Sequence, residues 1–265
     1  MPSNEEQKVK SFWESRATEK DIPQTEVTHR DVWQRWLEVE VIKKHITGYG
    51  RVLDVGCGNG YTTKLIAPLV EQVVGIDYSE EMIRRAEEES IRQSSSDNEQ
   101  IVFRVCDVRQ LSPALLGVFD AVISERCLIN LPSWEDQKQA IANIASILRP
   151  GGRFVFIEGS RNGRRRLNEL RVAVGLGEMP PVWHNVDFDD EATLEYLAES
   201  FRVECRLHFG VYDFVSRVVH PLMVAPERPK YEARINEVAA KLALDVQEMG
   251  RVSRVLALIL RRLPA

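Results

Sequence analysis

The stretch that most constrains this chain is residues 51–60, RVLDVGCGNG. Its apolar residues Val52, Leu53 and Val55 form a short run that is typical of a buried parallel strand. The alternating glycines that follow have no Cβ, so the backbone can turn tightly and a ligand can lie against the main chain. A helix start at Tyr61 then offers free N–H groups in its first turn. The stretch therefore predicts a strand, a ligand-binding loop and a helix.

The spacing of these glycines separates two classes of cofactor. The dinucleotide fingerprint Gly-x-Gly-x-x-Gly, read from Gly56, needs glycine at position 61, where this chain has Tyr61. Residues 54–60 read instead Asp-x-Gly-x-Gly-x-Gly. This pattern resembles the first motif of the class I S-adenosylmethionine-dependent methyltransferases, an acidic residue and a spacer followed by alternating glycines. The resemblance covers about residues 50–160, and it implies S-adenosylmethionine as the cofactor and methyl transfer as the activity.

Strands and helices alternate over this region. Strands are expected in residues 51–55, in 72–79 with its end at Asp77, in 101–111 with its end at Asp107, and in 119–131 and 153–159. Helices are expected after the glycine loop, after Ser79 and after Ser133, and serine suits the N-cap position. The alternation predicts an α/β fold, a doubly wound and mostly parallel sheet with helices on both faces. With two further strands at 201–209 and 251–263, the resemblance implies a seven-stranded, Rossmann-like methyltransferase sheet with a helical lid and an insertion.

The flanking segments are expected to build on this sheet. Residues 1–48 are predicted to form an N-terminal helical lid, because apolar positions over 31–46 follow a helical period. Residues 49–265 form the predicted methyltransferase domain. In the family the last two strands pair as an antiparallel hairpin, and here residues 211–250 would be inserted between them. This insertion and residues 160–188 are expected to wall the acceptor pocket. The insertion should contain a helix, with these residues at its start and along one apolar side: Pro229, Ile235, Val238, Ala239, Leu242 and Val246.

Acidic residues fall at the ends of three predicted strands, where ligands of such sheets bind. The resemblance implies that Asp54 lies near the amino acid end of the cofactor, that Asp77 accepts hydrogen bonds from both ribose hydroxyls, and that Asp107 accepts from the adenine amine. The segment FWESRA near the N-terminus resembles an aromatic-plus-basic lead-in that holds the cofactor carboxylate, although an aromatic side chain packed beside a solvated arginine explains it equally. The expected cofactor-binding residues are Trp13, Arg16, Asp54, Gly56, Cys57, Gly58, Gly60, Asp77, Tyr78, Met82, Asp107, Val108 and Ser124.

Methyl transfer is a direct displacement, so proximity and alignment supply most of the available catalysis. A hydroxyl acceptor also needs its proton removed, and Glu125 and His184 are the expected catalytic residues for that step. His29 and His220 are weaker candidates. The fourth strand ends in SERC, residues 124–127, and lacks the Asn-Pro-Pro-Tyr signature of enzymes that methylate nucleic-acid bases or glutamine. This departure favours a small-molecule acceptor. The main prediction is methylation of an oxygen of that acceptor.

A basic segment follows the fifth strand directly. Residues 161–171, RNGRRRLNELR, hold five arginines against one glutamate. The planar fork of arginine suits phosphate and carboxylate. We therefore expect an anionic or sugar-like acceptor, bound by Arg126, Arg161, Arg164 and Arg171. A solvated helix face is the alternative.

Composition disfavours several classes of protein. A net charge of −5 argues against a nucleic-acid coat, and no apolar run reaches the ~18 residues of a membrane span. The four cysteines, at 57, 106, 127 and 205, lack the paired spacing of zinc ligands, so no metal is expected. The N-terminus has no signal-peptide core, which predicts a cytoplasmic location. We expect no nucleic-acid or membrane partner, and a homodimer is left open.

Three other functions stay open at this point. The first is a small-molecule N-methyltransferase that acts on an amine. The second is a nucleotide-dependent oxidoreductase, which Tyr61 disfavours. The third is a catalytically silent cofactor-binding module, which would have no need of such large elaborated segments.

Overall fold

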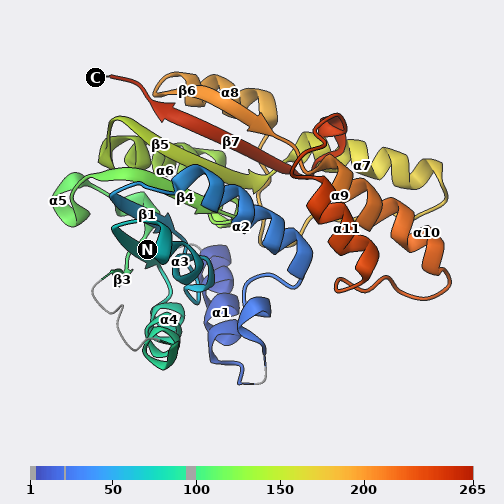
Figure 1. Cartoon of the computed structure of the whole chain (residues 1–265), viewed down its shortest axis with the longest axis horizontal. Coiled ribbons are helices and arrows are strands. Elements are labelled where there is room, and N and C mark those ends of the chain that lie inside the picture. The colour runs from blue at the N-terminus through green and yellow to red at the C-terminus, as the bar shows by residue number, and fades with distance from the viewer. Residues whose placement is uncertain (1–3, 21, 94–99, 265) are drawn as a thin grey trace.

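A seven-stranded sheet forms the centre of the computed structural model, which describes residues 4–20, 22–93 and 100–264 (Figure 1). The strand order is β3-β2-β1-β4-β5-β7-β6. The first five strands pair in parallel, whereas β7 is antiparallel to both β5 and β6. This architecture confirms the predicted doubly wound, mostly parallel fold. The strands are β1 Arg51–Val55, β2 Gln72–Asp77, β3 Ile101–Val105, β4 Phe119–Glu125, β5 Leu148–Gly159, β6 Phe201–Leu207 and β7 Val255–Arg262.

Helices cover both faces of the sheet because successive strand residues point to opposite sides. In β1, Val52 belongs to the same hydrophobic core as residues of α2, α3 and α11, whereas its neighbour Leu53 belongs to the core that contains residues of α6 and α8. In β5, Val155 and Phe154 divide between the two cores in the same way. The helices are α1 Asn4–Thr18, α2 Val32–Ile46, α3 Tyr61–Ile66, α4 Glu80–Gln93, α5 Pro113–Leu116, α6 Trp134–Ile147, α7 Arg161–Ala173, α8 Asp190–Ala198, α9 Gly210–Phe214, α10 His220–Val224 and α11 Arg234–Leu242.

The predicted helix starts are confirmed by their caps. The Ser79 hydroxyl accepts a hydrogen bond from the Met82 N–H, and the Ser133 hydroxyl accepts from the Asp136 N–H. The third strand is shorter than predicted. It ends at Val105, because Asp107 instead caps a short 3-10 turn and accepts a hydrogen bond from the Arg109 N–H.

The N-terminal segment contains two helices with different environments. In α2, eight side chains are buried, and Leu37 and Ile42 are fully enclosed in one core. In α1, Ala17 is the one buried residue, and the helix packs against α4. Thus α2 belongs to the body of the domain, while α1 lies on its surface. A lid role for this segment stays a prediction.

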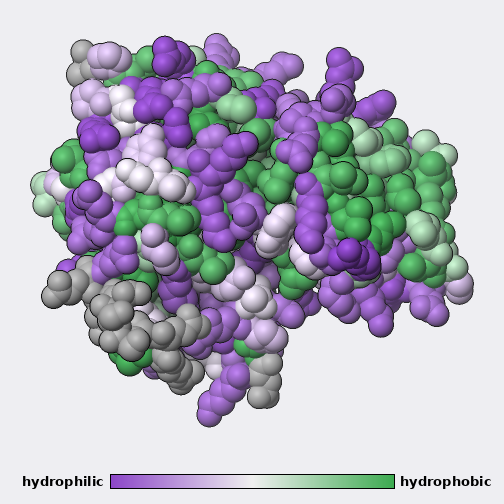
Figure 2. Space-filling view, viewed as in Figure 1, coloured by the Kyte–Doolittle hydropathy of each residue, from purple (hydrophilic) through white to green (hydrophobic). Residues whose placement is uncertain are grey.

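The insertion between β6 and β7 contains α9, α10 and α11, so the predicted antiparallel hairpin with an insertion is confirmed. Its last helix differs from the prediction, because it begins at Arg234 and buries Asn236, Ala239 and Ala240. The Asn236 amide donates to the carbonyls of residues 230 and 231, which sets this face inward. Val238 and Leu242 are 42% and 50% exposed, and Figure 2 shows a hydrophobic surface on this side of the molecule.

Among the described residues, no helix is long and apolar enough to cross a membrane.

Candidate active site

The glycine loop after β1 is held open by its backbone conformation. Gly56, Gly58 and Gly60 have φ values of 69°, 54° and 70°, in the left-handed region that favours glycine. A Cβ at Gly56 would overlap Cys127, and one at Gly58 would lie 2.7 Å from Thr28 Cγ2. The loop therefore needs glycine for both conformation and space.

Asp77, at the end of β2, fixes this loop from the neighbouring strand. Its Oδ2 accepts a hydrogen bond from the Gly58 N–H at 3.0 Å, and its Oδ1 accepts from the Ser79 N–H at 2.9 Å. Asp54, in β1, accepts from the Thr63 hydroxyl at 2.6 Å. Burial raises the pKa of each carboxyl group to about 6. A ligand with an ammonium group or a diol would favour their ionised forms.

A cavity of about 550 Å³ opens beside these carboxylates, within the usual size range of small-ligand sites. Most of the expected cofactor-binding residues line it, namely Trp13, Arg16, Asp54, Gly56, Cys57, Gly58, Asp77, Tyr78, Met82, Asp107 and Val108. Two do not. A Cβ on Gly60 would face the Phe103 ring, and Ser124 is buried, where its hydroxyl donates to Glu158.

Asp107 and Arg16, like Asp54 and Asp77, are already engaged by other groups of the protein. Asp107 accepts from the Arg109 guanidinium through both carboxylate oxygens. Arg16 donates to the carbonyls of Glu26 and Val27, which ties α1 to the following loop. These contacts compete with the roles that the resemblance implies for Asp107 and Arg16.

Both expected catalytic residues line the same cavity. Glu125 accepts a hydrogen bond from the Thr62 hydroxyl at 2.7 Å, and burial raises the pKa of its carboxyl group. The His184 ring packs at 4.9 Å from Phe12 and 5.2 Å from Trp13, between centroids. Burial lowers the pKa of His184 to about 4, and its Nδ1 has no hydrogen-bond partner among the described residues.

Of the four arginines expected to bind the acceptor, Arg126 lines the cavity. Its φ of 56° is unusual for a residue with a side chain, and its guanidinium donates twice to one oxygen of Glu38, from Nε at 2.9 Å and from Nη2 at 2.7 Å. The structure does not bring Arg161, Arg164 or Arg171 to the cavity.

Those three side chains, all on α7, have partners elsewhere. Arg161 pairs with Asp189 and Arg164 with Asp187, in the segment that follows the helix. Arg171 donates to the carbonyls of Gly177 and Arg217. These three arginines, which the sequence predicted to bind the methyl acceptor, thus donate to carboxylates and carbonyls of the protein instead.

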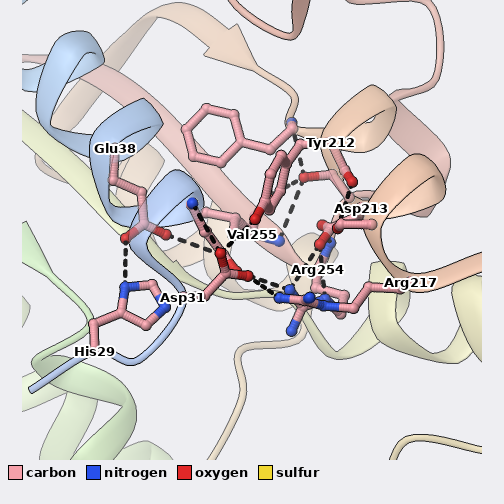
Figure 3. A network of polar contacts seen from close by, with 12 residues as sticks. His29, Asp31, Glu38, Tyr212, Asp213, Arg217, Arg254 and Val255 are labelled. Carbon is pink, nitrogen blue, oxygen red and sulfur yellow. Dashed lines mark hydrogen bonds and ion pairs between the residues drawn. The ribbon is translucent and has the colours of Figure 1, made fainter. Parts of the chain in front are cut away.

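A polar network beside the same cavity was missed by sequence reasoning. It joins residues 29–38 to residues of the insertion and to Arg254, which directly precedes β7 (Figure 3). Asp31 accepts from the Tyr212 hydroxyl and from Arg217, whose cation lowers the pKa of the Asp31 carboxyl against the effect of burial. Arg254 pairs with Asp213 at 2.8 Å. No local spacing links these residues, so the sequence held no signal for the network.

Known proteins are similar to this chain in its central part and in its fold. The profile of a family described as "Methyltransferase domain" matches residues 53–156. These residues contain the glycine loop and the three strand-end acids. Residues 53–156 therefore form a methyltransferase core.

One curated relative of this methyltransferase core is a ubiquinone biosynthesis O-methyltransferase of Xanthomonas campestris pv. campestris, 38% identical over 102 residues. The match spans 38% of this chain and 40% of the relative, so it covers less than half of either protein.

Solved structures of methyltransferases share the fold over the whole chain. The N-methyltransferase NodS of Bradyrhizobium japonicum, in complex with S-adenosylhomocysteine, is 18% identical, covers 99% of this chain and 100% of its own, and has a TM-score of 0.60. Phosphoethanolamine N-methyltransferase 1 of Haemonchus contortus is 17% identical, covers 100% of this chain and 50% of its own, and has a TM-score of 0.63. At these identities the likeness concerns the fold alone.

Proposed function

We propose that this protein is an S-adenosylmethionine-dependent methyltransferase that methylates an oxygen of a polar small molecule. The observation that carries the proposal is the convergence of Asp54, Asp77 and the glycine loop on one cavity at the carboxyl edge of the sheet. The sulfonium of the cofactor supplies an activated methyl group. The protein then has to bind the acceptor, align its oxygen with this methyl group and exclude water.

The residues at one side of the cavity fit this cofactor chemically. Asp77 can accept from ribose hydroxyls, and Asp54 can attract the ammonium group. Tyr78, Met82 and Val108 offer an apolar surface for adenine. Two buried carboxyl groups with pKa values near 6 gain a favourable partner when a cationic, hydroxyl-bearing ligand binds.

The other side of the cavity favours a hydroxyl-rich, sugar-like acceptor. Arg126, Arg217 and Arg254 line it, but each is paired with a carboxylate, Glu38, Asp31 and Asp213 respectively. These pairs place hydrogen-bond donors and hydrogen-bond acceptors side by side in the cavity wall, without a large excess of positive charge. This balance supports a polyol, or an acceptor with a single negative charge, over a polyanion. The cytoplasmic location and the homodimer stay predictions.

Calorimetry on the purified protein tests the cofactor. We expect S-adenosylhomocysteine to bind with a micromolar dissociation constant and NAD not to bind. Asp77→Ala should weaken binding by about 1–3 kcal/mol, because the ribose hydroxyls lose a charged acceptor. The exposed Glu191→Ala is the matched control and should bind normally. Heat with NAD, and none with S-adenosylhomocysteine, would end the proposal.

Mass spectrometry then tests the acceptor. The protein is incubated with methyl-labelled cofactor and a small-molecule extract of cells. We expect label on an oxygen of a hydroxyl-rich compound. Label on an amine nitrogen would identify the protein as an N-methyltransferase instead.

A further inference from the structure

His29 occupies a distinctive position in the acceptor side of the cavity. It lies in the loop between α1 and α2, it lines the cavity, and its side chain is 23% exposed. Its Nδ1 lies 3.7 Å from Oε2 of Glu38, while its second ring nitrogen points away from Glu38 (Figure 3). The imidazole therefore has one nitrogen beside a carboxylate and another available to a ligand.

Glu38 is fully buried, and its two oxygens differ. Oε1 accepts three hydrogen bonds, two from Arg126 and one from Gln34. Oε2 has no hydrogen-bond partner among the described residues. A buried carboxylate oxygen without a donor is costly, so a proton on the facing Nδ1 of His29 would stabilise this arrangement.

The two residues expected to remove a proton lack this arrangement. Glu125 already accepts from the Thr62 hydroxyl, and burial raises the pKa of its carboxyl group against the opposing effect of the Arg35 cation. His184 lies among aromatic rings, and its Nδ1 has no partner among the described residues, so nothing fixes its tautomer.

We propose that His29 is the general base for a hydroxyl acceptor and that Glu38 is its positioning residue. This inference rests on the proposed function. The acceptor hydroxyl gives its proton to Nε2 of His29 as its oxygen forms the new bond to the methyl carbon. The bond between that carbon and sulfur breaks, and its electron pair stays on sulfur. The resulting imidazolium is paired with Oε2 of Glu38, so the positive charge passes from the sulfonium to a compensated site.

A weak base is sufficient for this step. Burial lowers the pKa of His29 to about 4, with Arg126 and Arg35 acting in the same direction and with Glu38 and Asp31 opposing. His29 is thus unprotonated at neutral pH and ready to accept. As the acceptor oxygen forms its bond to the methyl carbon, its proton becomes far more acidic than that of imidazolium, so the proton transfer is downhill.

The tautomer of His29 tests the dyad without any acceptor. Nitrogen-15 NMR of the wild-type protein at pH 7, with and without S-adenosylhomocysteine, reports which ring nitrogen carries the proton, and His29→Asn assigns the signal. We expect a neutral ring with the proton on Nδ1. A proton on Nε2, or a protonated ring, would overturn the proposal.

Methyl transfer into the small-molecule extract supplies the second readout. His29→Asn should lower the rate of label transfer at least 100-fold and change the Kd of S-adenosylhomocysteine less than threefold. His45→Asn, at the far end of α2 and outside the cavity, is the matched control and should keep the wild-type rate. A His29→Asn rate near wild type overturns the inference alone. If the wild type transfers no label, the proposed function fails, and the tautomer still decides the dyad.

Discussion

At the scale of single residues, Glu158 organises the loop that carries Arg126. This fully buried carboxylate, in β5, accepts from the Ser124 hydroxyl and from the N–H groups of Cys127, Leu128 and Ile129. Glu158→Ala should destabilise the fold by on the order of 2–4 kcal/mol, because it leaves several buried donors without a partner. Urea unfolding measures the loss. Glu199→Ala, on the surface, is the control, and equal losses in both variants would contradict this role.

The same residue shows what a sequence can predict at this scale. Asp54, Asp77 and the glycines were predicted because they lie in one local pattern at the ends of neighbouring strands. Glu158 lies in a predicted strand. The backbone N–H groups that it accepts from belong to the loop and short 3-10 turn after β4, and the sequence gives no sign that this turn faces Glu158. Glu38 was missed for a related reason, since its partner Arg126 lies 88 residues away.

At the scale of elements, α1 is the segment that ligand binding should order. It reaches over the cavity through Phe12, which packs on Trp183, and through Trp13, which donates to Asn130. With S-adenosylhomocysteine bound, we expect backbone amides of α1 to exchange about tenfold more slowly or more, because the ligand adds contacts under the helix. Amides of α2 should not change, since that helix is already buried. Hydrogen exchange checks both, and unchanged exchange in α1 would make it permanent scaffold.

Element types were easier to predict than the faces that elements present. Alternating apolar runs indicated the strands, and N-cap serines indicated two helix starts. For α7, Arg161 and Arg164 pair with Asp189 and Asp187, which follow the helix by many positions. For α11, close packing selected alanines and Asn236 for the inner face, which a count of hydrophobic residues could not reveal.

At the scale of the whole molecule, protonation links the site to the stability of the fold. The raised pKa values of Asp54, Asp77 and Glu158, about 6, 6 and 7, favour the fold at low pH, and this contribution is lost as pH rises through them. The lowered pKa values of His29 and His184, both about 4, have the opposite effect, favouring the fold above the ordinary pKa of 6.5. Between about pH 4 and 6.5 the carboxyl groups and the histidines change the stability of the fold in opposite directions. The pH dependence of ligand affinity therefore reports on the carboxyl groups more directly than the pH dependence of stability does.

Affinity for S-adenosylhomocysteine should therefore rise with pH and level off above about pH 7. We propose that the ligand binds with Asp54 and Asp77 ionised, and burial raises the pKa of each carboxyl group to about 6. Between pH 5.5 and 7.5 the gain is roughly 15-fold if both must lose a proton, and roughly fourfold if one must. Calorimetry at these two pH values measures the gain, and buffers of different ionisation enthalpy should show protons released on binding near pH 6. Asp77→Asn should reduce the pH dependence toward the fourfold limit, because one titrating group is gone. The same affinity at both pH values, without proton release, would mean that these carboxylates do not face the ligand's cationic and hydroxyl groups.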